Sequence, residues 1–173
     1  MSANQKTNLP PVDVATACDK EFTKKLLNSP VGEFIRRCFA CGTCTAGCPI
    51  REVDDRYNPR RIVRMILYGM KDELLRSDFV WLCANCYTCQ ERCPQGVRLT
   101  DIMRELRNMA VAEGIAPPGL KMQAQALCKY GRMYEIEDFD NKKRTKAGMA
   151  TLETDLADLK TLLEKEGLDG KLK

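Results

Sequence analysis

The stretch CANCYTCQERCP, residues 83–94, decides how the chain folds. Three of its cysteines follow one another at intervals of three, whereas the fourth comes one residue late and directly precedes a proline. The same irregular spacing occurs earlier, in CFACGTCTAGCP at residues 38–49. The cysteines are Cys38, Cys41, Cys44 and Cys48 in the first stretch and Cys83, Cys86, Cys89 and Cys93 in the second. Because both copies share the late cysteine, we expect them to act as one unit.

The composition limits the chemistry that the chain can perform. It has 10 cysteines and no histidine in 173 residues, so imidazole serves neither as a ligand nor as a general base, and a Rieske centre is excluded. The N-terminal sequence has no basic start followed by an apolar stretch, unlike a secretory signal. The apolar runs are too short to span a bilayer. We therefore expect a cytoplasmic protein without a membrane span, in which clustered cysteines bind metal or transfer electrons.

The formal net charge of +4 identifies no charged partner. A solvated surface explains a small basic excess of this kind. Two anionic iron–sulfur clusters of about −2 each would roughly cancel it. Nothing else in the sequence supports nucleic-acid binding, and we expect none.

The spacing of the first three cysteines suits an iron–sulfur cube. A tight loop with two residues between successive cysteines can present three sulfurs to three corners of one cube. Thiolates are suitable ligands because iron in these clusters takes tetrahedral sulfur coordination. Gly42 and Gly47 keep the first loop small and allow backbone N–H groups to approach the sulfurs. The two stretches therefore predict two [4Fe–4S] clusters.

The late cysteine is assigned from a known pattern. Two-cluster ferredoxins carry the same C-x2-C-x2-C-x3-C-P run, and there the fourth cysteine of each motif binds the other cluster. The extra spacer residue and the rigid proline fit this arrangement, since they direct the last cysteine away from its own loop. On this pattern the ligands are Cys38, Cys41, Cys44 and Cys93 for the first cluster and Cys83, Cys86, Cys89 and Cys48 for the second.

Zinc is the alternative metal. A pair of structural zinc sites would also use four cysteines each, and the chain would then be an interaction module rather than a redox protein. Zinc modules, however, pair two C-x2-C knuckles across a longer gap and do not need this three-cysteine rhythm twice.

Helix caps and apolar periodicity predict a mostly α protein. Helices are expected after Ser29-Pro30, from Asn58-Pro59 to Gly69, and from Thr100, as the cap, to Gly114. Further helices are expected over residues 119–130 and over a leucine-spaced segment near the C-terminus. The expected divisions are a helical N-terminal arm over residues 1–29, an alpha-helical ferredoxin-like two-cluster domain over 30–114 and a C-terminal helical extension over 115–173.

Three smaller segments complete this description. FVWL, after Ser77-Asp78, is a short apolar segment that leads into the second cysteine loop, and EIEDFDNKKRTKAG is a charged linker. The final helix rests on Leu152, Leu156, Leu159 and Leu163, whose spacing predicts one apolar face. No segment predicts a strand.

Several residues near the motifs have plain structural explanations. Cys18 and Cys128 stand outside the motifs and are expected to be half-buried apolar residues. Trp81 and Tyr87 flank the second loop, where packing explains them better than shielding of a cluster from water. The arginines nearest the cysteines either tune a cluster's potential or form solvated ion pairs; they are Arg36, Arg37, Arg51 and Arg92.

The motifs and their surroundings resemble one known family. CFACGTCTAGCP, the insert that begins YNPRRIVRM, then WLCANCYTCQERCPQGV and DIMRELRN together are similar to the iron–sulfur subunit of heterodisulfide reductase that is designated C, over roughly residues 30–112. That is the small iron–sulfur subunit of a soluble complex of methanogenic archaea. The helical insert between the motifs is unlike compact bacterial ferredoxins and looks more like the alpha-helical ferredoxin module of succinate dehydrogenase.

The resemblance implies a role as an electron relay. In that family a flavin-containing subunit supplies electrons, the small iron–sulfur subunit carries them through two clusters, and the catalytic subunit reduces the mixed disulfide of coenzyme M and coenzyme B. A hydrogenase or a formate dehydrogenase is the upstream donor. Adjacent cysteine pairs mark the catalytic subunit, and this chain has none. We therefore expect an oxidoreductase subunit that transfers electrons without a substrate site of its own.

Two other redox proteins fit part of the pattern. The iron–sulfur subunit of a quinone-linked dehydrogenase, of the succinate or glycolate type, is the alternative within the same class. It would bring a plant-type C-x4-C-x2-C motif for a [2Fe–2S] cluster, which this sequence lacks. A freely diffusing ferredoxin is a weaker fit, because such proteins rarely carry helical arms of this extent.

Overall fold

The described part of the chain is helical and contains no strand, as the sequence predicts. The computed structural model describes residues 13, 18–153, 156–167 and 170. The chain divides into two units, residues 1–107 and 108–173. This division falls within helix α9 (Leu99–Ala112), whereas the expected boundaries after residues 29 and 114 stay predictions.

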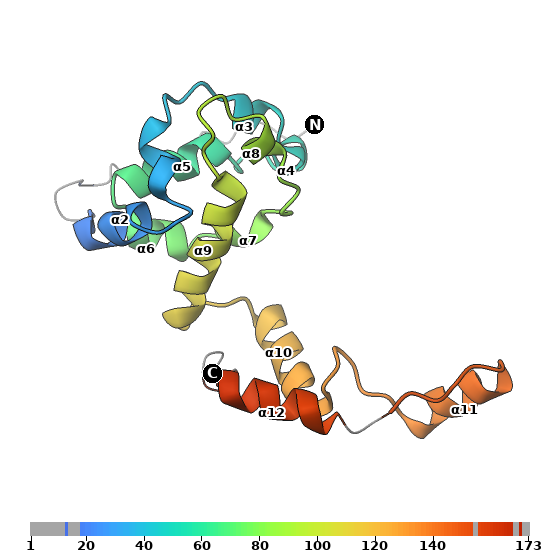
Figure 1. The fold of residues 1–173 in the computed structure, drawn as a ribbon. Helices are drawn as coiled ribbons and strands as arrows, with labels where there is room; N and C mark the ends of the chain where they lie inside the picture. Colours follow the sequence, from blue (N-terminus) through green and yellow to red (C-terminus); the bar gives the residue numbers. More distant parts are fainter. Residues whose placement is uncertain (1–12, 14–17, 154–155, 168–169, 171–173) are drawn as a thin grey trace. The chain divides into compact units, whose positions relative to one another are not determined.

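Unit 1 carries both cysteine loops (Figure 1). Before α9 its elements are α2 (Lys20–Leu27), the 3₁₀ helix η1 (Glu33–Arg37), α3 (Thr43–Ala46), α4 (Pro49–Val53), α5 (Pro59–Leu67), α6 (Lys71–Leu75), α7 (Phe79–Leu82) and α8 (Thr88–Glu91). The one-turn helices α3 and α8, one from each cysteine loop, pack against each other, and α3 also packs on α5. The two loops are therefore joined at the level of the fold.

Helix α5 begins and ends where the sequence predicts. Asn58 caps its first turn by accepting a hydrogen bond from the Arg61 backbone N–H at 3.1 Å. Gly69 follows the last turn with a φ of 71°, which favours glycine. Ile62 and Ile66 are fully buried, and burial of such a side chain contributes about 1.5–3 kcal/mol. Helix α5 is therefore a stable support for the first cysteine loop, against which it packs through α3.

Helix α2 (Lys20–Leu27) lies in the N-terminal extension that was expected to be helical, although no residue span was predicted for it. Asp19 caps it by accepting a hydrogen bond from the Phe22 backbone N–H, and Phe22 and Leu26 are buried four positions apart. The Asp19 backbone N–H also donates to the Gly69 carbonyl at 2.8 Å. A polar cap followed by three apolar residues, only two of them buried, gives a weak pattern, so tertiary contact rather than periodicity defines this helix. The first 17 residues of the expected arm lie outside the described part, apart from residue 13.

The helix predicted at Ser29-Pro30 is wrong in type and in starting point. Ser29 Oγ donates to the Leu26 carbonyl at 2.7 Å and accepts a hydrogen bond from the Gly32 N–H at 3.1 Å. The serine therefore closes a turn after α2, and η1 begins only at Glu33. A methyl group at Gly32 would lie 1.8 Å from the Leu26 carbonyl oxygen, so this turn requires glycine.

Helix α9 corrects the expected role of Thr100. The helix begins at Leu99, so Thr100 lies inside the first turn and is not its cap. Its side chain is 1% exposed, and its hydroxyl oxygen lies 3.5 Å from Cys89 Sγ. The end of the helix agrees with the prediction, since Gly114 follows it with a φ of 74°. Thr100 therefore contacts a cysteine instead of capping the helix, and the local sequence does not indicate this tertiary contact.

Unit 2 confirms one predicted helix and corrects two segments. Helix α10 (Pro118–Tyr130) occupies the predicted span, with Gly131 ending it. The segment expected to be a linker contains α11 (Asp138–Lys146), because Glu137 and Asp140 form a reciprocal capping box. Helix α12 (Ala157–Glu166) begins after Leu152 and Leu156, so the predicted leucine face is wrong in its first half.

No helix in the described residues combines the length and the apolar composition that crossing a membrane requires.

Candidate metal centre

The two cysteine loops follow the same backbone path. In each loop the residue just before the second cysteine takes a left-handed conformation, Ala40 with φ 59° and Asn85 with φ 53°. The residue after the second cysteine does the same, Gly42 with φ 87° and Tyr87 with φ 62°. Glycine adopts this conformation freely, whereas a tyrosine is strained by roughly 1–3 kcal/mol. The sequence repeat is thus a structural repeat, and Tyr87 has a backbone role beyond the packing that the sequence indicates.

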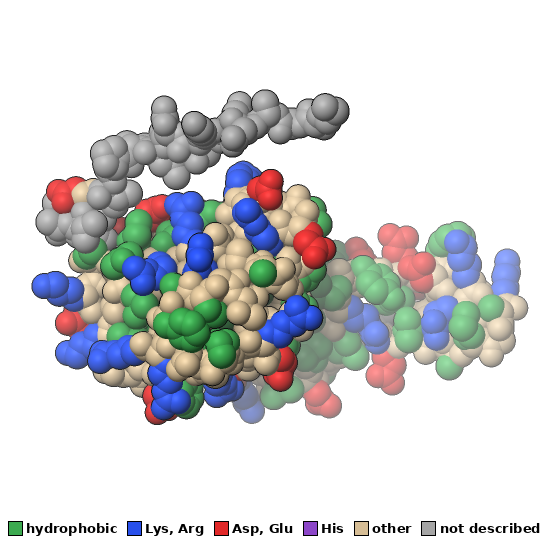
Figure 2. Space-filling view, turned by 90° about the horizontal axis from the view of Figure 1, so that it is seen from above, with side chains coloured by type: hydrophobic (Ala, Val, Ile, Leu, Met, Phe, Trp, Pro, Cys, Tyr) green, Lys and Arg blue, Asp and Glu red, His purple; other side chains and the backbone are tan. Residues whose placement is uncertain are grey.

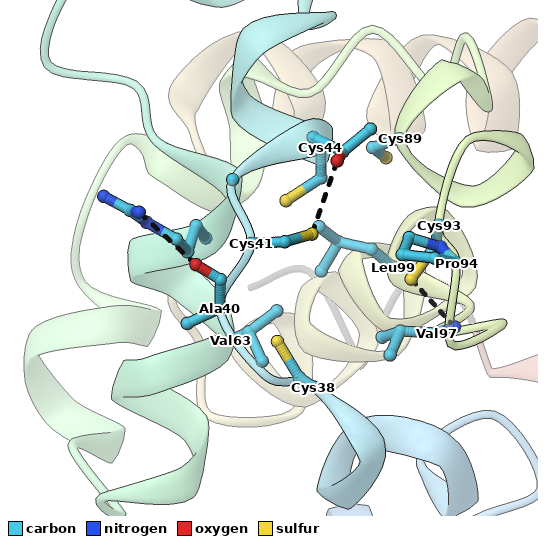
Figure 3. A pocket seen from close by; sticks show the side chains of 13 residues that line it. Cys38, Ala40, Cys41, Cys44, Val63, Cys89, Cys93, Pro94, Val97 and Leu99 are labelled. Atoms are coloured by element: carbon cyan, nitrogen blue, oxygen red, sulfur yellow. Dashed lines mark hydrogen bonds between the residues drawn. The ribbon is translucent and has the colours of Figure 1, made fainter.

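The first cavity lies between the loops and is lined by cysteines from both. In Figure 3 the labelled side chains surround one space. Its cysteines include Cys38, Cys41 and Cys44 of the first loop and Cys93 of the second. Val63 and Leu99 contribute apolar surface. All four thiols predicted for the first cluster therefore meet at one place.

The second cavity has the reciprocal lining. Its cysteines are Cys83, Cys86 and Cys89 of the second loop and Cys48 of the first. The structure thus brings together both predicted sets of four thiols, with the late cysteine of each loop at the cavity of the other. Cys89 lines both cavities, so it lies between them.

The late cysteines are held by the turns that follow them. Cys48 precedes Pro49, the first residue of α4, and its side chain is buried. The Val97 backbone N–H donates a hydrogen bond to Cys93 Sγ at 3.3 Å. In the described residues no three cysteine, aspartate or glutamate side chains gather closely enough to hold one metal ion. The eight thiols are instead arranged around two cavities.

A threonine accompanies the exposed thiol of each loop. Cys41 Sγ lies 3.3 Å from Thr43 Oγ1, and Cys86 Sγ lies 3.5 Å from Thr88 Oγ1. Hydrogen bonds from the threonine hydroxyl, and then from its backbone N–H, lower the pKa of both Cys41 and Cys86. Both motifs contain the spacing C-x-T at this point, and this repeat in the sequence is a signal for the contact.

The buried thiols behave in the opposite way. Burial raises the pKa of Cys44 and of Cys89, because a thiolate loses its solvation there. A bound metal compensates such a loss, since a coordinating thiol is deprotonated outright. The donor set of each cavity therefore suits a positively charged iron–sulfur core.

Two arginines that the sequence did not single out support the loops. Arg60 lines the first cavity, and its guanidinium donates to the Ala40 carbonyl at 3.4 Å. Arg107 of α9 donates to three carbonyls next to the second loop, those of Val80, Trp81 and Cys83, at 2.7, 3.3 and 2.5 Å. Both contacts join residues far apart in the sequence, so local patterns could not reveal them.

Three of the four arginines that the sequence did single out have ordinary contacts. Arg37 lies over the Phe34 ring at 4.3 Å, and Arg51 pairs with exposed Asp55 at 3.6 Å. Arg92 packs against Gly47, where a methyl group would lie 2.8 Å from the guanidinium. Figure 2 shows Lys and Arg side chains of unit 1 scattered among apolar ones on the face in view. Cys18 and Cys128 are half-buried and line neither cavity.

Asn58 connects the first loop to α5, and its removal is expected to weaken this connection. Its Oδ1 accepts from Thr45 Oγ1 at 2.9 Å as well as from the Arg61 N–H. Asn58→Ala should lower the free energy of unfolding by about 1–2 kcal/mol, the usual effect of losing such a cap. Denaturant unfolding of the full chain, followed by circular dichroism, measures it. Asn108→Ala on exposed surface is the control, and equal effects of the two substitutions would contradict the role of Asn58.

Comparison with known proteins agrees with this geometry. Residues 34–97 match the model of a 4Fe-4S dicluster domain. The H(2):CoB-CoM heterodisulfide,ferredoxin reductase of Methanothermobacter thermautotrophicus has a subunit, designated C, that is 36% identical over 134 residues, which are 78% of this chain and 71% of the relative. The iron-sulfur subunit designated C 2 of the CoB--CoM heterodisulfide reductase of Methanocaldococcus jannaschii is 32% identical, covering 86% and 83%. The chain belongs to this family of small heterodisulfide reductase subunits.

A third relative extends the family to another methanogen. The Ferredoxin:CoB-CoM heterodisulfide reductase of Methanosarcina mazei has a subunit, also designated C, that is 38% identical over 112 residues, which are 65% of this chain and 68% of the relative. Members of this family are iron–sulfur subunits of an oxidoreductase, and the chain carries two [4Fe–4S] clusters. The zinc alternative is therefore wrong. The cavities fit the clusters, since each presents four thiols from two loops.

Proposed function

We propose that the chain is a cytoplasmic electron-relay subunit of a heterodisulfide reductase complex. The proposed ligands are Cys38, Cys41, Cys44 and Cys93 for one cluster and Cys83, Cys86, Cys89 and Cys48 for the other. When bound, such clusters accept and release single electrons. The observation that carries this proposal is that the late cysteine of each loop lines the cavity of the other loop, an arrangement that suits two neighbouring redox centres within one unit.

The chain's own residues support a relay in two ways. Apolar side chains keep water from the thiols, with Val63 and Leu99 at the first cavity and Met103 at the second. Cys41 and Cys86, by contrast, are exposed, one for each cavity. These two thiols are the proposed points at which electrons enter and leave the protein.

The proposed partners are the other subunits of the complex. A flavin-containing subunit supplies the electrons, and the catalytic subunit reduces the disulfide of coenzyme M and coenzyme B. The relatives' names mention H2 and ferredoxin, which supports a low-potential donor such as a hydrogenase or a formate dehydrogenase upstream. This chain has no adjacent cysteine pair, and a non-catalytic role follows from the proposal.

Anoxic purification of the tagged full chain from its native cells tests this function. We expect about eight iron atoms per chain, a broad visible absorbance that dithionite bleaches, and copurification of a flavoprotein and of a protein with adjacent cysteine pairs. Addition of the heterodisulfide to the reduced complex should restore the absorbance. Copurification with a quinone-linked dehydrogenase, or reoxidation only by a quinone, would contradict the proposal.

A further inference from the structure

The two cavities are built from a second repeat besides the cysteine motifs. Helices α5 and α9, with the residues just before them, form this second repeat: a residue of one segment and the residue forty positions away in the other line different cavities. Arg60, Val63 and Val97 line the first cavity, and their counterparts Thr100, Met103 and Tyr57 line the second. Matched positions allow a direct comparison of the groups that face the sulfurs of each cavity.

Thr100 gives the second cavity a hydroxyl that the first one lacks. It is almost completely buried, and its Oγ1 lies 3.5 Å from Cys89 Sγ. A metal-bound thiolate has no proton, so the hydroxyl must be the donor in this contact. The matching position in the first cavity is occupied by Arg60, which is exposed to solvent.

Tyr57 gives the second cavity another hydroxyl. Its side chain is 2% exposed and lines the cavity together with Cys83. A phenol carries its proton at neutral pH, so the buried hydroxyl of Tyr57 can donate to a sulfur of this cavity. The matching residue in the first cavity, Val97, has an apolar side chain, although its backbone N–H reaches Cys93.

The groups around the first cavity do not make up this difference. Thr45 Oγ1 lies 4.0 Å from Cys44 Sγ, but its proton goes to Asn58 Oδ1 at 2.9 Å. Arg60 is exposed, so water and salt screen its charge. Thr43 and Thr88 make the same contact in their respective loops, and their effects cancel. Apart from the matched threonines, the first cavity therefore has backbone hydrogen bonds to Cys93 and Cys44, whereas the second has two buried hydroxyls.

Hydrogen bonds to the sulfurs of a cluster raise its reduction potential, because they stabilise the additional negative charge of the reduced state. On the proposed ligation, we propose that the buried hydroxyls of Thr100 and Tyr57 set the order of the two potentials, giving the cluster at the second cavity the higher one. When the chain holds a single electron, that electron then resides mainly on the cluster at the second cavity, which Cys86 lines. Thr100 and Tyr57 are positioning residues, since they act through Cys89 and Cys83.

A potentiometric titration of the purified full chain, followed by electron paramagnetic resonance, tests this order. Thr100→Val and Tyr57→Phe should each lower the higher of the two potentials and leave the lower one in place. We expect each substitution to change the ratio of reduced to oxidised cluster about tenfold at a fixed potential, a shift of about 59 mV for one electron. A shift of the lower potential would overturn the proposal. So would a fully iron-loaded variant in which neither potential shifts.

Two controls separate the hydroxyl from the packing around it. Thr100→Ser keeps the hydroxyl and loses the methyl group, so it should keep the wild-type potential; a shift equal to that of Thr100→Val would reject the hydroxyl as the cause. Tyr87→Phe removes a hydroxyl from the same loop, one that accepts from Arg104 at 3.2 Å rather than facing a sulfur. This control should leave both potentials unchanged, and a shift like that of Tyr57→Phe would count against a specific effect.

The matched threonines assign each potential to its cavity. Thr43→Val should lower the potential belonging to the first cavity and Thr88→Val that of the second. If Thr88→Val moved the lower potential, the proposed order would be reversed and the inference wrong. All of these potentials are measured on the chain alone. A chain that failed to transfer electrons to a heterodisulfide reductase would therefore refute the proposed function without changing this result.

Discussion

Replacement of Cys48 by alanine is expected to remove the cluster whose remaining ligands lie in the other loop, and to spare the cluster begun at Cys38. Cys48 lines the second cavity with Cys83, Cys86 and Cys89, and it does not line the first. An iron that loses its thiolate in this cavity has no histidine or carboxylate among the lining residues to take its place. The iron content should fall from about eight to about four atoms per chain.

Residual spectra distinguish this result from general damage. Cys48→Ala and Cys83→Ala should leave the same electron paramagnetic resonance spectrum, and Cys93→Ala and Cys38→Ala should share the other one. Cys18→Ala is the control, because Cys18 lines neither cavity and should keep both clusters. If Cys48→Ala left the spectrum of Cys38→Ala, each loop would complete its own cluster and the proposed exchange of ligands would be wrong.

The cysteine spacing matched the known pattern of two-cluster ferredoxins, and that pattern predicted which thiols line each cavity. Three sulfurs at intervals of three fit one tight loop, and the prolines after Cys48 and Cys93 turn the fourth sulfur away. The known pattern therefore predicted which thiols meet without any knowledge of the helices between the loops. The sequence also predicted α5, because the cap at Asn58 and the end at Gly69 are both marked by residues of the segment itself.

The groups that surround the sulfurs were beyond such local patterns. Thr100 looks like a helix cap because a threonine precedes an aspartate and an apolar run, but Cys89, eleven residues earlier, lies within reach of its hydroxyl. Tyr57 lies in the insert between the motifs and meets Cys83 only in the folded chain. Helix α11 was missed for a different reason, since Glu137 is an unusual cap and the segment has almost no apolar residues.

Arg107 binds the backbone segment that leads into the second loop. Its replacement is expected to cause loss of the second cluster before the first. The last carbonyls of a helix have no partner within it, and those near the end of α7 accept from this guanidinium instead. Its carbon Cζ also lies 6.0 Å from the centre of the Trp81 ring. Arg107→Met keeps an unbranched apolar stem but removes all the donors. With the partial exposure of the site taken into account, we expect a loss of about 3 kcal/mol in the stability of the loaded chain.

The consequence for the cluster can be followed directly. With an iron chelator present, the visible absorbance of Arg107→Met should decay at least tenfold faster than that of the wild type, and the resonance signal of the second cluster should disappear before the first. Arg104→Met, almost one turn earlier on α9, is the control, because its exposed guanidinium contacts the side chains of Tyr87 and Asp101 rather than the loop carbonyls. Equal decay in the two variants, or earlier loss of the first cluster, would show that Arg107 does not hold the second loop. The decay rate of Arg107→Lys should fall between those of the wild type and Arg107→Met. Its ammonium group keeps the charge but cannot reach three carbonyls as a planar guanidinium does.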